Sequence, residues 1–110
     1  MSSYAVAHMH EVSMGQPIVE YLQRIDATLA PFGGRFIVHG GPPEVLEGSW
    51  AGFLIVIEFP DHAQASGWYQ SDAYQDIVPL RTDNSRSDVI LVDGVDLGHR
   101  ATDVLGPEAA

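Results

Sequence analysis

The stretch Gly33-Gly34-Arg35-Phe36-Ile37-Val38-His39-Gly40-Gly41 decides the fold, because it places strand-forming residues between two pairs of glycines. Glycine adopts backbone angles that strain other residues, so each pair predicts a change of chain direction. The first pair is placed to end a helix and the second to end a strand. Successive side chains of a strand point to opposite faces, so we expect Arg35 and His39 on one face and Phe36 on the other. A strand with an arginine and a histidine on one face is a candidate wall of a pocket.

The segments around this stretch alternate between strand and helix patterns. One apolar stripe recurs at steps of four and three, which is typical of a helix with one buried face: Ile18, Leu22, Ile25, Leu29 and Phe32. Gly33 is placed to end this helix, and Asp61 and Ser71 are placed to cap later helical segments. We expect strands over residues 4–12, 35–39, 52–59 and 88–95, helices over 17–32 and 61–70, and a helical turn over 71–78.

The order β-α-β-β-α-β predicts a ferredoxin-like α+β sandwich in residues 1–95, an antiparallel sheet with two helices on one face. The other face would carry apolar side chains from every strand, and an exposed apolar sheet face usually marks an interface. We therefore expect a homodimer in which two sheets pack into an α/β barrel. Residues 96–110 show no periodicity, which predicts a C-terminal tail or an arm that docks on a partner.

The composition excludes several classes of function. The formal net charge is -10 and all five basic residues are arginines, which argues against binding to nucleic acid or to an anionic membrane surface. The absence of lysine and cysteine excludes Schiff-base chemistry, thiol nucleophiles and cysteine-ligated metals. No apolar run is long enough to cross a bilayer and no signal-peptide pattern is present, so we expect a cytoplasmic protein.

Four blocks of the chain resemble an uncharacterised family, the domain-of-unknown-function family 1330 (DUF1330) of the dimeric α/β-barrel superfamily. These blocks are Gly33–Gly41, Val45–Gly48 with Trp50, Val56–Pro60, and Trp68–Gln75 continuing to Pro79–Arg81. The resemblance implies the ferredoxin-like fold and the dimer, and no particular reaction. Relatives in the superfamily include monooxygenases of aromatic polyketides, lactone isomerases and haem-handling enzymes. The family usually has an arginine where this chain has His39, a group that titrates near neutral pH.

Three residues are candidate catalytic groups: His39, Glu58 and Tyr69. A histidine suits general acid/base work because its charge changes near neutral pH. Glu58 lies within the most apolar strand, where a carboxylate is costly unless it is paired or protonated. Arg35, Arg81 and His39 are its candidate partners. The structural alternative is an ion pair that only holds the fold together.

Four residues are candidate substrate-binding groups: Arg35, Trp68, Tyr74 and Arg81. Aromatic residues at helical spacing are typical of a core, yet phenol hydroxyls over a pocket suit an aromatic or polyketide-like ligand. We expect Arg81 in a loop after Pro79, where it could hold a substrate carboxylate or cap the preceding helix.

Together these residues favour a small-molecule enzyme that uses general acid/base chemistry and no tightly bound cofactor. One alternative is a ligand-binding or scaffold homodimer without chemistry. Another is a metal- or haem-binding variant that uses His8, His10 or His39, because a His-x-His pair on a strand directs two imidazoles to one side. Strand alternation alone also explains that pair, and we assign no metal ligand.

Overall fold

The computed structural model describes residues 1–106, so the last part of the predicted tail, 107–110, lies outside the described residues. Four antiparallel strands form one sheet in the order β2-β3-β1-β4. The strands are β1 (Ser3–Val12), β2 (Arg35–His39), β3 (Phe53–Phe59) and β4 (Ser85–Asp93). The last strand begins three residues before the predicted range of 88–95. Pairing across β1 is continuous over most of its length, which makes β1 and β3 the central strands.

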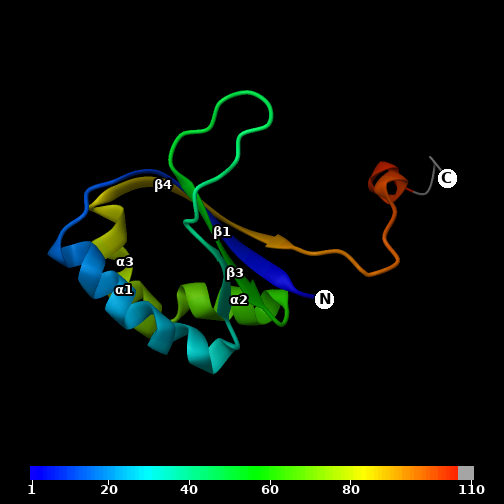
Figure 1. Cartoon of the computed structure of the whole chain (residues 1–110). Helices are drawn as coiled ribbons and strands as arrows, with labels where there is room; N and C mark the ends of the chain where they lie inside the picture. Colours follow the sequence, from blue (N-terminus) through cyan, green and yellow to red (C-terminus); the bar gives the residue numbers. More distant parts are fainter. Residues whose placement is uncertain (107–110) are drawn as a thin grey trace.

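All the helices of the sandwich lie on one side of this sheet, and the other side carries none (Figure 1). They are α1 (Gln16–Leu29) with a short 3-10 continuation η1 (Ala30–Phe32), α2 (His62–Gln70) and α3 (Asp72–Thr82). The predicted α+β ferredoxin-like class is confirmed, with three α-helices because the second crossover is divided at Ser71. Within residues 1–106, no helix combines the length and apolarity needed to cross a membrane.

The helix boundaries follow the predicted caps. Gly33 ends the first helical segment in the left-handed conformation, at φ 68°, where a side chain would be strained. The Asp61 carboxylate accepts a hydrogen bond of 2.9 Å from the backbone N–H of Gln64 at the start of α2. The Ser71 hydroxyl accepts one of 3.2 Å from Tyr74 and donates one of 2.7 Å to the carbonyl of Trp68. Ser71 therefore ends α2 and begins α3.

The expectation that Arg81 lies in a loop is wrong, because α3 continues through Pro79 to Thr82. Proline has no backbone N–H to donate within a helix. The carbonyl that this N–H would have bonded belongs to Gln75, which is exposed. The carbonyl of Pro79 still accepts a hydrogen bond of 3.0 Å from Asp83. The helix is thus extended by one turn, and this turn carries Arg81.

The predicted alternation along β2 is also wrong, because the strand contains a β-bulge. Its register against β3 shifts between Phe36 and Val38, which leaves Ile37 as the extra residue. Cross-strand partners share a face, and His39 pairs with Ile55 on the face that the helices cover. Phe36 and His39 therefore lie on the same side with their rings stacked at 4.2 Å, whereas Arg35 lies on the opposite side.

The buried core lies between the sheet and the helices, around Phe59, Trp68, Tyr74 and Ile77. On the bare face, apolar side chains stay exposed: Ile37, Val38, Ile90 and Val92. The β2–β3 loop rises from one end of the sheet, and the chain after β4 extends away from the body (Figure 1). This extension contains a second 3-10 helix, η2 (Ala101–Leu105).

Candidate functional site

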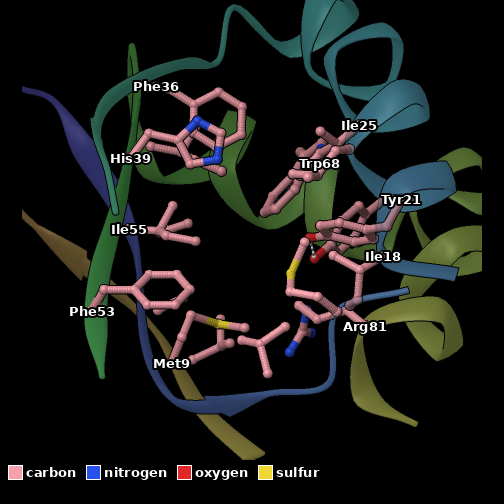
Figure 2. Close-up of a pocket in the computed structure, with 18 residues that line it drawn as sticks. Met9, Ile18, Tyr21, Ile25, Phe36, His39, Phe53, Ile55, Trp68 and Arg81 are labelled. Carbon is pink, nitrogen blue, oxygen red and sulfur yellow. Dashed lines mark hydrogen bonds between the residues drawn. The ribbon is translucent and has the colours of Figure 1, made fainter. Parts of the chain in front are cut away.

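A cavity of about 250 Å³ lies between the sheet and the helices (Figure 2). Its walls are mostly apolar and come from β1, α1 and β3: Ala5, Met9, Ile18, Ile25, Phe53 and Ile55. A cavity of about 150 Å³ is enough to bind benzene, so this one has room for a larger organic molecule. The volume therefore fits a small, mainly apolar ligand.

The cavity exists because the central strand carries short side chains where it faces the helices. Ala5 and Ala7 lie on the inner face of β1 and line the cavity, and α1 lies on the other side of it. Helix α1 packs on α3 rather than closely on the β2–β3 half of the sheet. The short side chains of β1 and the packing of α1 against α3 leave this space open. Larger core side chains fill the rest of the space between the sheet and the helices.

Two tyrosines meet at one end of the cavity. The hydroxyls of Tyr21 on α1 and Tyr74 on α3 are 2.8 Å apart, and their rings meet edge to face with centroids 6.3 Å apart. Burial raises the pKa of the Tyr21 phenol well above its ordinary value, and the neighbouring Tyr74 raises it further. The Tyr21 hydroxyl is consequently neutral near pH 7 and remains able to donate a hydrogen bond.

Arg81 lies beside this hydroxyl pair, two helical turns after Tyr74 on the same face of α3. The residue is 6% exposed, and its Nη1 donates a hydrogen bond of 3.0 Å to the hydroxyl of Ser87 on β4. Burial lowers the pKa of the guanidinium, but the neighbouring Tyr74 and Tyr21 outweigh burial and the pKa is raised. Arg81 is therefore a buried cation that lines the cavity.

The opposite side of the cavity carries His39, stacked on Phe36 (Figure 2). His39 is exposed and still lines the cavity, as do the exposed side chains of Met14 and Leu22. These three residues mark where the cavity meets solvent. A ligand in the cavity would lie between an imidazole at the opening and the hydroxyl and guanidinium groups at the far wall.

The structure brings together four of the seven site residues predicted from sequence: His39, Trp68, Tyr74 and Arg81. Trp68 is 2% exposed, and its indole N–H donates a hydrogen bond of 3.0 Å to the hydroxyl of Thr28. Tyr69 is half-buried against the rings of Trp68 and Tyr74, but it is not part of the cavity wall.

Glu58 and Arg35 lie on the bare face of the sheet, so the expectation that they share a pocket with His39 is wrong. Their ion pair joins Arg35 Nη2 to Glu58 Oε1 at 2.9 Å, and Arg35 Nε donates to the same oxygen at 3.1 Å. The hydroxyl of Tyr4 is 3.5 Å from the other carboxylate oxygen. The register explains this row, because Arg35 and Tyr4 both pair with Glu58 from either side of β3.

Tyr21 is a polar residue of the cavity wall that was not predicted from the sequence. It lies three residues after Ile18 and four before Ile25, which places it on the buried stripe of α1. A search for tyrosines on that stripe would have found it, but its partner Tyr74 is 53 residues away in the chain. Only the packing of α1 on α3 brings the two hydroxyls together.

The His-x-His pair lies on the bare face, away from His39. The His8 ring donates a hydrogen bond of 2.7 Å from Nε2 to the carbonyl of Ala51, and it stacks on Trp50. His10 Nε2 is 2.8 Å from a carboxylate oxygen of Asp88. Among residues 1–106, no group of three or more histidine, aspartate or glutamate side chains is arranged to hold a metal ion.

The chain belongs to a family defined by sequence. The model of the domain of unknown function DUF1330 matches residues 2–95, so the chain is a member of the DUF1330 family, as the sequence blocks predicted. No curated protein matches the chain.

Solved structures share the fold at low sequence identity. A protein of unknown function from Rhodopseudomonas palustris has a TM-score of 0.65 at 13% identity, covering 86% of this chain and 83% of that one. A dimeric ferredoxin-like protein of unknown function from Jannaschia sp. CCS1 has a TM-score of 0.63 at 15% identity, covering 86% of this chain and all of that one. SnoaB, a cofactor-independent oxygenase from Streptomyces nogalater, has a TM-score of 0.53 at 16% identity, covering 89% and 96%. These similarities define the fold and leave the activity open.

Proposed function

We propose that this protein is a small-molecule enzyme that works without a tightly bound cofactor and moves a proton on a substrate held in the cavity. The observation that carries the proposal is the placement of polar groups around an apolar space. His39 lies at the opening, and the hydroxyls of Tyr21 and Tyr74 lie at the far wall. A candidate base on one side and hydrogen-bond donors on the other form an arrangement that general acid/base chemistry uses.

The lining favours an aromatic or polyketide-like ketone as substrate. Phe36, Phe53 and Trp68 present ring surfaces to the cavity. In the tyrosine pair one O–H bonds to the other oxygen, which leaves the second O–H free to donate to a ligand oxygen. A flat apolar body with a carbonyl at one end would match both features.

The proposed step is the removal of a proton from a carbon next to the carbonyl. The imidazole of His39 takes the proton, the C–H electron pair becomes a carbon–carbon double bond, and the carbonyl oxygen takes the negative charge. A tyrosine hydroxyl donates a hydrogen bond to that oxygen and stabilises it. Return of the proton from His39 to the same carbon or a conjugated one restores the ketone, so atoms and charge balance without a further reactant.

The fold is compatible with chemistry of this kind, because SnoaB has the same fold and is a cofactor-independent oxygenase. That support comes from the fold alone, since the identity is 16%.

Proton exchange tests the proposal directly. With 2-tetralone in deuterated buffer, the wild-type protein should accelerate loss of the proton NMR signal from the carbon next to the carbonyl. His39→Ala should reduce this acceleration by about 100-fold or more, which is the usual effect of losing a general base. His62→Ala is the matched control, because His62 is exposed and pairs with Asp93 away from the cavity. Equal rates for wild type and His39→Ala would contradict the proposal.

A binding protein without chemistry is the second candidate, and the position of Glu58 favours it. Glu58 lies on the bare face, so the cavity lining within residues 1–106 contains one histidine, His39, and no carboxylate to act with it. Calorimetric binding of 2-tetralone with no acceleration of exchange over buffer would select this candidate.

We also propose that the protein is a homodimer formed through the bare face of the sheet. The exposed side chains of Ile37, Val38, Ile90 and Val92 form a patch that a second copy would cover. The dimeric ferredoxin-like neighbour from Jannaschia supports this at the level of the fold.

Light scattering should give twice the chain mass of 11.9 kDa. Ile90→Asp should halve the measured mass, whereas Val19→Asp on the exposed side of α1 should leave it unchanged. A monomeric wild type would overturn the proposal.

A further inference from the structure

Arg81 is a buried cation without a carboxylate partner among residues 1–106. This is unusual in a chain with 15 acidic and 5 basic residues. Three other arginines each have a carboxylate within 4 Å, although they are far more exposed: Arg24 with Glu20, Arg35 with Glu58, and Arg86 with Glu11. The acidic residues thus neutralise charge at the surface, and the buried guanidinium has neutral oxygens beside it.

A buried charge without a counter-charge is costly, and proteins usually supply a partner. The guanidinium has five N–H donors, of which Nη1 uses one on the hydroxyl of Ser87. The phenol oxygens of Tyr21 and Tyr74 lie close enough to raise its pKa. Burial holds the Tyr21 phenol neutral near pH 7, and no carboxylate within residues 1–106 pairs with Arg81. The local positive charge is therefore uncompensated by the described part of the chain.

We propose that Arg81 is the binding site for one carboxylate of the ligand, beside the tyrosine hydroxyl that donates to the carbonyl oxygen of the same ligand. The ligand is then an aromatic or polyketide-like acid, whose apolar body fills the cavity and whose carboxylate supplies the missing counter-charge. The inference rests on the proposed function in so far as it assumes that the cavity binds a small molecule. It adds the charge of the substrate, which the proton-transfer step does not require.

The chemistry of the guanidinium suits one carboxylate. Its planar group binds carboxylates through two parallel N–H donors, which leaves the free tyrosine O–H for the carbonyl oxygen of the ligand. One cation among neutral hydroxyls balances one negative charge, so a dianion would remain partly uncompensated. The net charge of -10 repels anions at long range, so a local cation is needed to hold one.

A pair of probes with the same shape and different charge tests the inference. We expect wild-type protein to bind 1-naphthoate about 10- to 100-fold more tightly than 1-naphthamide in calorimetric titrations at pH 7. A hydrogen bond between the charged guanidinium and the carboxylate of the probe accounts for a difference of this size. This comparison needs no mutant. Equal affinity for the two probes would overturn the carboxylate site and leave the cavity-binding proposal standing. Failure of both probes to bind would contradict the proposed function as well.

Variants then assign the preference to Arg81. Arg81→Met should remove the preference for 1-naphthoate and keep the affinity for 1-naphthamide, and Arg81→Lys should retain part of the preference. Arg24→Met is the matched control, because it removes the same charge from the exposed surface of α1. If Arg81→Met does not fold, Arg81→Lys provides the same test through a weakened preference, because an ammonium lacks the two parallel donors of the guanidinium. A preference that persists unchanged in these variants would overturn the assignment.

Discussion

The two faces of the sheet carry the same kinds of side chain and use them differently. On the bare face, Arg35 pairs with Glu58, and His10 pairs with Asp88. On the helix-covered face, Arg81 is 6% exposed beside two neutral tyrosines. The charge of Arg35 on the bare face is neutralised by a carboxylate of the chain, whereas no carboxylate within residues 1–106 pairs with Arg81 at the cavity.

The difference between the two faces distinguishes charged residues that serve stability from a charged residue that is available for function. Ion pairs at an accessible surface contribute little and require no further partner. An enclosed cation that lines an apolar space has a cost in the folded state, and such costs are concentrated at sites that bind or react. The comparison therefore locates the candidate site on the helix-covered face, although the sequence directs attention to acidic and basic residues of both faces.

The largest difference between the faces is expected for the two tryptophans. Trp68 is 2% exposed and donates a hydrogen bond to Thr28, so Trp68→Ala should lower the free energy of unfolding by about 3–5 kcal/mol. Trp50 is 44% exposed and stacks on His8, so Trp50→Ala should cost about 0.5–1.5 kcal/mol. Urea unfolding followed by circular dichroism measures both values. Similar costs for the two substitutions would show that the bare face is as enclosed as the cavity side.

The tyrosine pair should make stability depend on alkaline pH. Folding raises the pKa of Tyr21, so the unfolded chain loses this proton first, at the ordinary tyrosine value of 10.0. Its contribution to stability is complete below that pH and is lost as the pH rises above it, by up to about 1.4 kcal/mol per pH unit. Tyr21→Phe should reduce stability at pH 8 by about 1 kcal/mol, through the lost hydrogen bond, and should flatten the decrease above pH 10.

Tyr4 provides the control on the other face, because its hydroxyl lies near Glu58. Tyr4→Phe should keep the alkaline decrease of the wild-type protein, since Tyr21 is still present. If Tyr21→Phe shows the same decrease as wild type between pH 9 and 11, the buried tyrosine pair does not control stability there.

The sequence was sufficient for the fold and insufficient for the site. Local signals define the architecture: the apolar stripe of α1, the left-handed Gly33, and the caps at Asp61 and Ser71. The predictions from sequence fail where a single residue changes the local backbone structure. The bulge at Ile37, which no residue pattern indicated, places His39 on the helix-covered face. Helix α3 continues through Pro79 and therefore places Arg81 at the cavity instead of in a loop.

The cavity itself depends on contacts between distant segments. Short side chains on the inner face of β1 are visible in the sequence as Ala5 and Ala7, but they leave a space only because α1 packs on α3. The same packing brings Tyr21 to Tyr74. Periodicity shows that a residue is buried, whereas the identity of its neighbour comes from tertiary packing that periodicity does not describe.

The smallest effect is expected from the ion pair on the bare face. Arg35 has a side chain that is 70% exposed in the single chain, so a double-mutant cycle of Arg35→Ala with Glu58→Gln in the monomeric Ile90→Asp background should give a coupling of about 1 kcal/mol or less. Neither substitution should change the affinity for 1-naphthoate, because both residues lie on the side of the sheet away from the cavity. Thermal unfolding measures the coupling and calorimetry the affinity. A coupling of about 3 kcal/mol or more in that background would show that the pair is enclosed within the single chain. A loss of affinity, in contrast, would mean that the charges of the two faces act together and that the separation between them does not hold.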